Sequence, residues 1–398
     1  MERPEESSDK FYSICGSILL TVSALGRFVS YPISTSDYTY FVSKWFIALQ
    51  NHPGLTAFRT PFSDYSPLYL YFLKLLTYIP IPSLYSVKTL SILFDIAMAL
   101  VVCTLVRKST NRLYTRAKLF FVFAIMFSIP TLVINSSLWG QSDAIYALGI
   151  LVCVYYILQN RPLAAILVFS LAFSVKLQAE FFLPVLVGYC LRRESSAGYL
   201  IFIPLIYFLS IIPARLGGGS LSDLLLVYAR ESGEYTSLSV SAPNVFTLFN
   251  HYQFLDSAQH ILFLGGILLA GFCSVTIAAY VFYKRNMSTE SMVRISLFCV
   301  LLLPYVLPRM HERYFYLADV LSVVYSLINP KYWYIPVLIV GSSLLSYIPY
   351  LSQVSWFSHL SIDLRIPSLL LVTALAVLSR HIVRREIILP TTTIAIPV

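Results

Sequence analysis

Charged residues are scarce in this chain, and those that could carry chemistry stand at the ends of long apolar segments. Only 12% of the residues are charged, whereas 58% are hydrophobic. A charge costs roughly 2.5 to 3.5 kcal/mol at the centre of a membrane helix, so membrane proteins contain few charged residues near their apolar segments. Clusters of charged residues beside such segments therefore indicate a functional site. Following the segments through a bilayer puts four polar groups on one face of the membrane. They are Asp37 and the runs at 139–143, 176–180 and 308–314.

The hydropathy pattern predicts an all-α polytopic membrane protein, with residues 1–398 forming a single integral membrane domain. A transmembrane helix needs about 20 mostly apolar residues, and twelve segments approach that length. The first is expected to remain as an anchor, because no basic region or small-residue cleavage site marks a signal peptide. The approximate limits of the twelve segments are 11–30, 84–106, 118–134, 143–159, 162–177, 179–191, 197–213, 259–283, 293–307, 314–328, 332–350 and 366–379.

The distribution of lysine and arginine predicts the orientation of these segments. Cytoplasmic loops of membrane proteins collect basic residues. With a cytoplasmic N-terminus, 17 of the 28 basic residues fall on the cytoplasmic side. We therefore expect a multi-pass membrane protein with both termini in the cytoplasm and the four polar groups on the extracytoplasmic face. Because the basic residues are scattered, the net charge of +9 does not indicate a nucleic-acid partner.

Two long segments are predicted on the extracytoplasmic side. The first, residues 31–83, contains an amphipathic stretch at 38–50 and an apolar stretch at 67–79 that is bracketed by prolines. Both are too short to span, and their aromatic residues favour helices that lie at the membrane interface. The second, residues 214–258, opens with a glycine-rich turn and is expected to form a partly ordered, mobile loop over the site.

Six cysteines lie in six different apolar segments. The chain has no Cys-x-x-Cys pair and no histidine at metal-ligand spacing, so these cysteines are expected to be small buried hydrophobic residues. They are Cys15, Cys103, Cys153, Cys190, Cys273 and Cys299.

Five short elements carry a resemblance to a known family. They are Ser-Asp-Tyr at 36–38, Tyr-Ser-Pro-Leu-Tyr at 65–69, Leu-Trp-Gly-Gln-Ser-Asp at 138–143, Ser-Val-Lys-Leu-Gln at 174–178 and Pro-Arg-Met-His-Glu-Arg-Tyr at 308–314. They resemble the GT-C glycosyltransferases, and most closely the bacterial relatives of the mannosyltransferases that build glycosylphosphatidylinositol anchors. The resemblance extends from about residue 30 to about residue 330. It implies a GT-C fold and a polytopic enzyme that transfers a sugar, mannose or another hexose, from a polyprenyl-phosphate carrier to an acceptor, with inversion.

A carboxylate must accept the proton of the attacking hydroxyl in such a reaction. Asp37 is the candidate base, because the resembling family is taken to use the acidic residue at this position of the first outside loop. An alternative is that Asp37 caps the helix predicted to follow it, since Ser-Thr-Ser-Asp precedes a helical pattern. Asp64 is the second outside carboxylate and the alternative base.

Basic residues are expected to bind the phosphate that leaves with the carrier. Arg309 and Arg313 are four residues apart and would share one helical face, and the arginine fork suits phosphate. Lys176 and His311 could add further donors. The alternative for either arginine alone is an interfacial side chain or an ion pair with Glu312.

The remaining polar residues at the segment ends are candidates to contact the sugar or the acceptor. Plainer interpretations stay open for several: Ser142 or Asp143 could cap a helix, and Lys176 could pair with Glu180. Glu312 could instead orient Arg309. The candidates are Glu312, Asp143, Gln141, Trp139, Gln178, Asp64, Tyr65 and Asn244.

The outside carboxylates are isolated and no Asp-x-Asp pair is present, so we expect metal-independent transfer and no cofactor. The expected partners are the lipid-linked donor, a hydroxyl acceptor in the envelope (lipid, glycan or protein) and membrane lipids, and the chain is expected to be a monomer. The alternative function is an ion-coupled transporter or a flippase for lipid-linked sugars. Asp95, near the middle of the second segment, keeps that alternative open, although a structural hydrogen bond explains it more simply.

Overall fold

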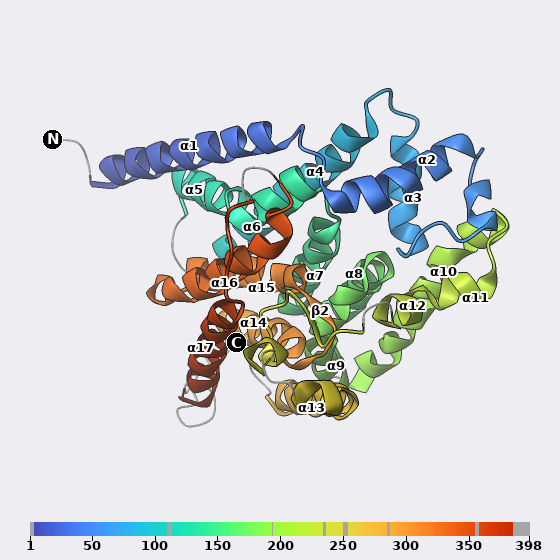
Figure 1. The fold of residues 1–398 in the computed structure, drawn as a ribbon. Coiled ribbons are helices and arrows are strands. Elements are labelled where there is room, and N and C mark those ends of the chain that lie inside the picture. The colour runs from blue at the N-terminus through green and yellow to red at the C-terminus, as the bar shows by residue number, and fades with distance from the viewer. Residues whose placement is uncertain are drawn as a thin grey trace.

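The protein is described from a computed structural model that covers residues 4–109, 114–192, 194–233, 236–249, 254–284, 287–354 and 358–384. The fold is almost entirely helical (Figure 1). In the described residues, the two short strands β1 (Ser239–Val240) and β2 (Met310–His311) pair in parallel, with Val240 opposite His311.

Seven helices in the described part of the chain are long and apolar enough to cross a membrane, which confirms an all-α polytopic membrane protein. A helix pair bent by 57° makes an eighth if the pair is counted as one span. The seven are α1 (Pro4–Ser30), α4 (Ser83–Ser109), α10 (Phe202–Leu216) with the turn η5 (Glu194–Ile201), α13 (Phe254–Tyr283), α14 (Thr289–Val306), α16 (Tyr334–Leu351) with η8 (Pro330–Tyr332), and α17 (Arg365–Ile382). The bent pair joins α5 (Arg116–Phe127) to α6 (Pro130–Val133) and η3 (Ile134–Trp139).

The other four predicted spans fall on shorter helices. At about 1.5 Å per residue, even the 16 residues of α7 reach only about 24 Å, less than the hydrocarbon thickness of about 30 Å. These helices are buried among their neighbours, and hydropathy cannot distinguish a core helix from a lipid-facing one. They are α7 (Asp143–Leu158), α8 (Pro162–Val175), α9 (Leu183–Leu191) with η4 (Leu177–Phe182), and α15 (Tyr316–Ile328) with η7 (Glu312–Phe315).

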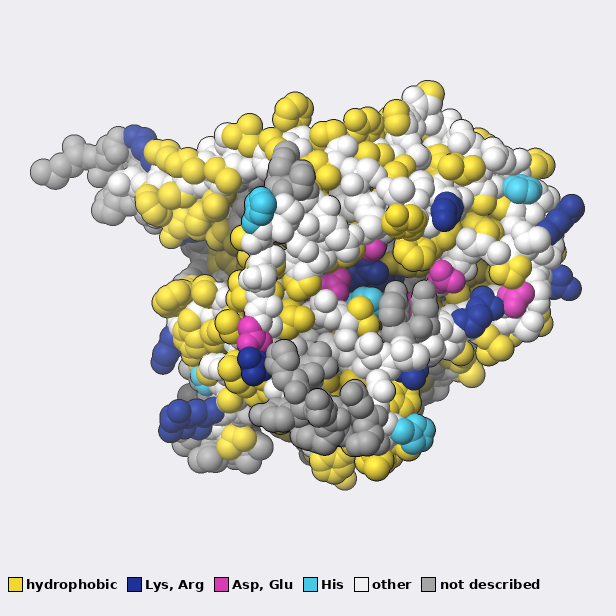
Figure 2. All heavy atoms as spheres, in the orientation of Figure 1, with side chains coloured by type: hydrophobic (Ala, Val, Ile, Leu, Met, Phe, Trp, Pro, Cys, Tyr) yellow, Lys and Arg dark blue, Asp and Glu magenta, His cyan; other side chains and the backbone are white. Residues whose placement is uncertain are grey.

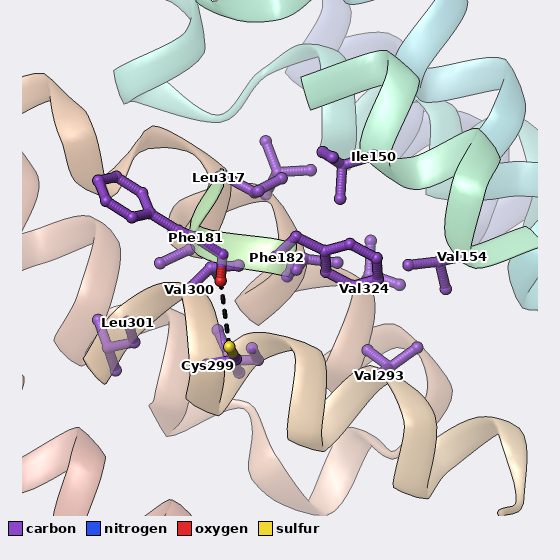
Figure 3. Packing of buried hydrophobic residues seen from close by; sticks show 14 of the residues in the cluster. Ile150, Val154, Phe181, Phe182, Val293, Cys299, Val300, Leu301, Leu317 and Val324 are labelled. Atoms are coloured by element: carbon purple, nitrogen blue, oxygen red, sulfur yellow. Dashed lines mark hydrogen bonds between the residues drawn. The ribbon is translucent and has the colours of Figure 1, made fainter. Parts of the chain in front are cut away.

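The core lies where these short helices meet α14. Ile150 and Val154 of α7 pack with Phe182 of η4 and Val324 of α15 (Figure 3). The Cys299 thiol on α14 donates a hydrogen bond to the carbonyl of Phe181 at 3.1 Å. All six cysteines are free thiols; Cys153, Cys190 and Cys299 are buried as expected, whereas Cys15, Cys103 and Cys273 are half-buried.

The first long segment, 31–83, folds into short helices that lie together near α10 (Figure 1). Its amphipathic stretch at 38–50 buries Val42, Trp45, Phe46 and Leu49. The Lys74 ammonium donates to the carbonyl of Leu49 at 2.7 Å and so ties the two main helices together. The elements are η1 (Tyr38–Val42), α2 (Ser43–Asn51), η2 (Thr56–Arg59) and α3 (Pro67–Leu76).

The second long segment also carries regular structure where it is described. It contains α11 (Leu221–Leu225), α12 (Val227–Gly233), β1 and η6 (Val245–Phe249). Part of the predicted loop, residues 234–235 and 250–253, lies outside the described residues.

Asp95 forms a structural contact, as the simpler interpretation of this residue predicted. Its Oδ2 lies 2.9 Å from Nη1 of Arg27 on α1, and the Tyr316 hydroxyl donates to Oδ1 at 3.2 Å. Arg27 also donates to Ser136 at 2.6 Å. A second buried carboxylate that the sequence did not single out, Asp319 on α15, accepts a hydrogen bond from Ser343 at 2.8 Å.

Candidate active site

A cavity of about 320 Å³ opens on one face of the molecule. Figure 2 shows a hollow in the middle of that face where acidic, basic and histidine side chains gather. The volume suits a small-molecule site. Its walls come from segments far apart in the sequence, and eight of the predicted site residues line it. They are Asp37, Asp64, Tyr65, Gln141, Lys176, His311, Glu312 and Arg313.

Asp37 stands at the start of η1 with one carboxylate oxygen held by two donors. Its Oδ2 accepts from Nη1 of Arg313 at 2.7 Å and from Nε2 of Gln141 at 2.8 Å. Its Oδ1 has no partner in the described part of the chain and is therefore the oxygen available to a ligand. The side chain makes no capping hydrogen bond, so the helix-cap alternative is wrong.

Gln141 connects the carboxylate to the opposite wall of the cavity. Gly140 before it has a φ of +71°, a conformation that glycine adopts without strain, and this turns the chain between η3 and α7. The Gln141 amide nitrogen binds Asp37, and its oxygen accepts from the Tyr65 hydroxyl at 3.4 Å. Gln141 thus orients Asp37 in addition to lining the cavity.

Arg313 is partly buried between Asp37 and Trp139. Burial lowers its pKa, but the carboxylates of Asp37 and Asp143 more than offset this, and the pKa lies above the usual range of arginine. Its Nε is buried and has no hydrogen-bond partner among the described residues. Because Arg313 also lines the cavity, its guanidinium is suited to hold an anion there.

Lys176 reaches the cavity from the junction of α8 and η4. Its ammonium donates to Oδ1 of Asp143, and Asn135 donates to Oδ2 of the same carboxylate at 2.7 Å. The alternative interpretation, in which Lys176 pairs with Glu180, is therefore wrong. Asp143 does not line the cavity, and it holds Lys176 in place instead of contacting a sugar. Ser142 makes no capping hydrogen bond either.

Arg309 does not share a helical face with Arg313. Residues 307–311 are not helical, and Arg309 has a φ of +61°, which turns its side chain into a different cavity. Its guanidinium lies 4.2 Å from the centre of the Phe263 ring. The alternative ion pair between Glu312 and Arg309 is not formed among the described residues. Glu312 has His311 beside it, with Nδ1 3.8 Å from Oε2.

Three predicted sugar or acceptor contacts lie elsewhere. Trp139 is buried against Tyr347 and Tyr350, with its ring centre 4.3 Å from that of Tyr350, so its face is not open to a sugar or to the membrane interface. Asn244 is buried and donates to the carbonyl of Leu307 at 3.3 Å, a structural contact. Gln178 lines the second cavity rather than the first.

Tyr350 and Glu231 line the cavity but were missed by the sequence analysis. The Tyr350 hydroxyl, near the end of α16, accepts hydrogen bonds from the backbone N–H of Asp37 and from the Ser36 hydroxyl, both at 3.0 Å. Glu231 on α12 lines both cavities. Neither belongs to a recognisable motif: Glu231 lies in the predicted loop 214–258, and Tyr350 is the last residue of the predicted span 332–350.

Fold and cavity together define a polytopic membrane protein with a carboxylate, an arginine and a lysine gathered in one cavity. The model of Glycosyltransferase family 87 matches residues 62–308, more than half of the chain, and the chain belongs to that family. It is therefore a membrane glycosyltransferase. No curated protein matches the chain. The match includes Gln141 and Lys176, whereas Asp37 and Arg313 lie on either side of it.

Proposed function

We propose that the chain transfers a hexose from a polyprenyl-phosphate carrier to a hydroxyl group in the cell envelope. The resemblance to mannosyltransferases favours mannose as the hexose. The observation that carries this proposal is the carboxylate of Asp37 beside the cations of Arg313 and Lys176 in one cavity. We further propose a bacterial plasma-membrane enzyme that acts as a monomer, with the cavity on the extracytoplasmic face and both termini in the cytoplasm.

Asp37 is the proposed general base. The acceptor oxygen attacks the anomeric carbon, its proton passes to Oδ1 of Asp37, and the bond from the anomeric carbon to the phosphate oxygen breaks. The electron pair leaves with the carrier phosphate. A base and a leaving group on opposite faces of the sugar give inversion. Gln141 and Arg313 hold Oδ2, which leaves Oδ1 to take the proton.

The leaving phosphate gains charge as the bond breaks, and fixed cations stabilise it. Arg313 and Lys176 line the cavity and supply that positive charge, and His311 lines it beside them. Asp143 keeps the Lys176 ammonium in place through a buried ion pair. Arg309 is not part of this set, because it lies in the second cavity.

Transfer from a labelled polyprenyl-phosphate sugar by purified protein tests the proposal. We expect wild-type protein to transfer the sugar, or to hydrolyse the donor slowly when no acceptor is present. Equal rates with and without a chelator are expected, because side-chain cations face the phosphate. A rate that falls with chelator and returns with Mg²⁺ or Mn²⁺ would show that a metal takes part. Absence of both transfer and hydrolysis under all conditions would remove the proposed donor.

The variant Arg313→Gln is expected to raise the KM for the donor about tenfold to hundredfold, because a hydrogen bond to a charged group contributes about 1.5 to 3 kcal/mol. Arg313→Lys keeps the charge and loses the fork, so its KM should fall between those of wild type and Arg313→Gln. Steady-state kinetics with varied donor concentration measure both. An unchanged donor KM in Arg313→Gln would exclude Arg313 as a phosphate ligand.

A further inference from the structure

Two buried side chains near the start of α4 hold the chain on either side of the hydrogen bond between Asp37 and Gln141. They are Lys88 and Ser91, which are three residues apart and so share one face of the helix. Neither lines the cavity that holds Asp37. Their partners are backbone carbonyls of the two segments that carry Asp37 and Gln141.

The Lys88 ammonium ties down the segment that leads from α1 to Asp37. It donates to the carbonyls of Ser30, Tyr31 and Ile33 at 3.1, 2.9 and 2.6 Å, which uses all three of its protons. These carbonyls lie at the end of α1, where backbone acceptors lack partners within the helix. Asp37 follows Ile33 by four residues, so the segment is held close to the carboxylate.

The burial of Lys88 shows that these contacts are its main interactions. Its side chain is fully buried and forms no ion pair with a carboxylate in the described part of the chain. Burying a charge without a counter-ion is unfavourable unless hydrogen bonds satisfy its donors. The stem of the side chain lies against Gly140, because a methyl group added there would lie 3.3 Å from Cγ of Lys88. Lys88 therefore contacts both the segment before Asp37 and the residue before Gln141.

Ser91 holds Gln141 from the same face of α4. Its hydroxyl donates to the Gln141 carbonyl at 2.6 Å. The side-chain nitrogen of the same glutamine donates to Oδ2 of Asp37 at 2.8 Å. Fixing the backbone of Gln141 therefore limits where its side chain can hold the carboxylate. A catalytic group displaced by about 1 Å can slow a reaction about 10²-fold, so anchors outside the cavity can affect the rate.

We propose that Lys88 and Ser91 are positioning residues for sugar transfer. They hold Asp37 and Gln141 so that Oδ2 of Asp37 stays bound and Oδ1 faces the acceptor. The inference rests on the proposed function, because it takes Asp37 as the base. Since both residues act through Asp37 and not on the donor phosphate, their loss is expected to lower the turnover number and to leave the donor KM unchanged.

Lys88→Met in the full chain, in lipid nanodiscs, is the first variant to test. Methionine keeps an unbranched apolar side chain and removes the ammonium. We expect the turnover number to fall about 10²-fold, with the donor KM unchanged. Lys108→Met, at the exposed opposite end of α4, is the matched control and should keep both values.

A double variant separates positioning from a general loss of structure. If Lys88 acts through Asp37, adding Lys88→Met to Asp37→Asn should lower the residual rate little further, because the base is already absent. Independent effects would instead multiply. A double variant that is about 10²-fold slower than Asp37→Asn alone would overturn the inference.

Hydrogen exchange measured by mass spectrometry reports on the held segment without any donor. Lys88→Met should speed the exchange of amides in residues 31–39, including the Asp37 N–H that donates to Tyr350, and leave α7 as in wild type. If wild-type protein fails to use the polyprenyl-phosphate donor but the segment loosens in this variant, the proposed function fails and the anchoring by Lys88 stands. If transfer proceeds and Lys88→Met turns over like wild type, the proposed function stands and the positioning role fails.

Ser91→Ala covers the case in which Lys88→Met does not fold. It removes one neutral hydrogen bond, so the turnover number should fall about threefold to tenfold, again with the donor KM unchanged. Wild-type turnover in Ser91→Ala would contradict the inference. So would a raised donor KM with unchanged turnover in either variant.

Discussion

Replacing Asp37 by asparagine is expected to lower the turnover number for sugar transfer about 10³-fold, within the range that a general base contributes. Asparagine has nearly the same shape but cannot take the acceptor proton at pH 7. The donor should still bind, because its phosphate is expected to contact Arg313, Lys176 and His311. Transfer and donor hydrolysis by the purified variant, measured beside donor binding, separate loss of the base from loss of the fold.

Asp64→Asn is the matched control for this experiment. Asp64 lines the same cavity but is exposed and has no ion pair among the described residues, so the change is expected to alter turnover much less than Asp37→Asn. The reverse ranking, with Asp64→Asn inactive and Asp37→Asn active, would make Asp64 the base. A variant Asp37→Asn that binds no donor would instead assign Asp37 to donor binding.

The helical fold could be predicted from the sequence because apolar length and helix formation are coupled in a membrane. Residues 84–106, for example, fall within α4. The number of membrane spans could not be predicted in the same way. Hydropathy measures the length of an apolar segment, but it does not tell whether the helix faces lipid or other helices. At Lys176 the backbone is extended, with φ −152° and ψ 134°, and η4 follows it, so the predicted span 179–191 is divided between η4 and the short α9.

The sequence predicted which residues gather in the site better than it predicted the directions of their side chains. Motif residues such as Gln141 and Arg313 meet Asp37 because the spans bring their ends to one cavity. The direction of each side chain depends on local backbone that spacing does not reveal. The Arg309 side chain points away from the first cavity because its φ is +61°. The spacing of the arginines in the sequence does not predict that conformation.

Contacts made by residues outside recognisable motifs could not be predicted from the sequence. Tyr350 is one of 29 tyrosines in an apolar chain, and only the packing of α16 against Trp139 places its hydroxyl at the backbone of Asp37. Trp139 is the opposite case: it belongs to a sequence motif, but its ring packs against other side chains. The residues that orient the carboxylate are therefore spread over the whole chain, including α16, which lies beyond the family match.

Asp95→Asn is expected to destabilise the fold by about 3 to 5 kcal/mol, because it leaves the buried charge of Arg27 without its counter-ion. The double variant Arg27→Met with Asp95→Leu removes both charges and should recover most of that loss. Thermal unfolding of the purified single and double variants measures both effects.

The same variants separate the enzyme from the transporter. If Asp95 only neutralises Arg27, the double variant keeps sugar transfer, because neither residue lines the cavity that holds Asp37. A transporter would need a charge in the span that changes state during its cycle. Loss of an ion-coupled flux in Asp95→Asn, with stability unchanged, would contradict the structural role and favour transport. Because Asp95 is held by both Arg27 and Tyr316, we expect stability, and not flux, to respond.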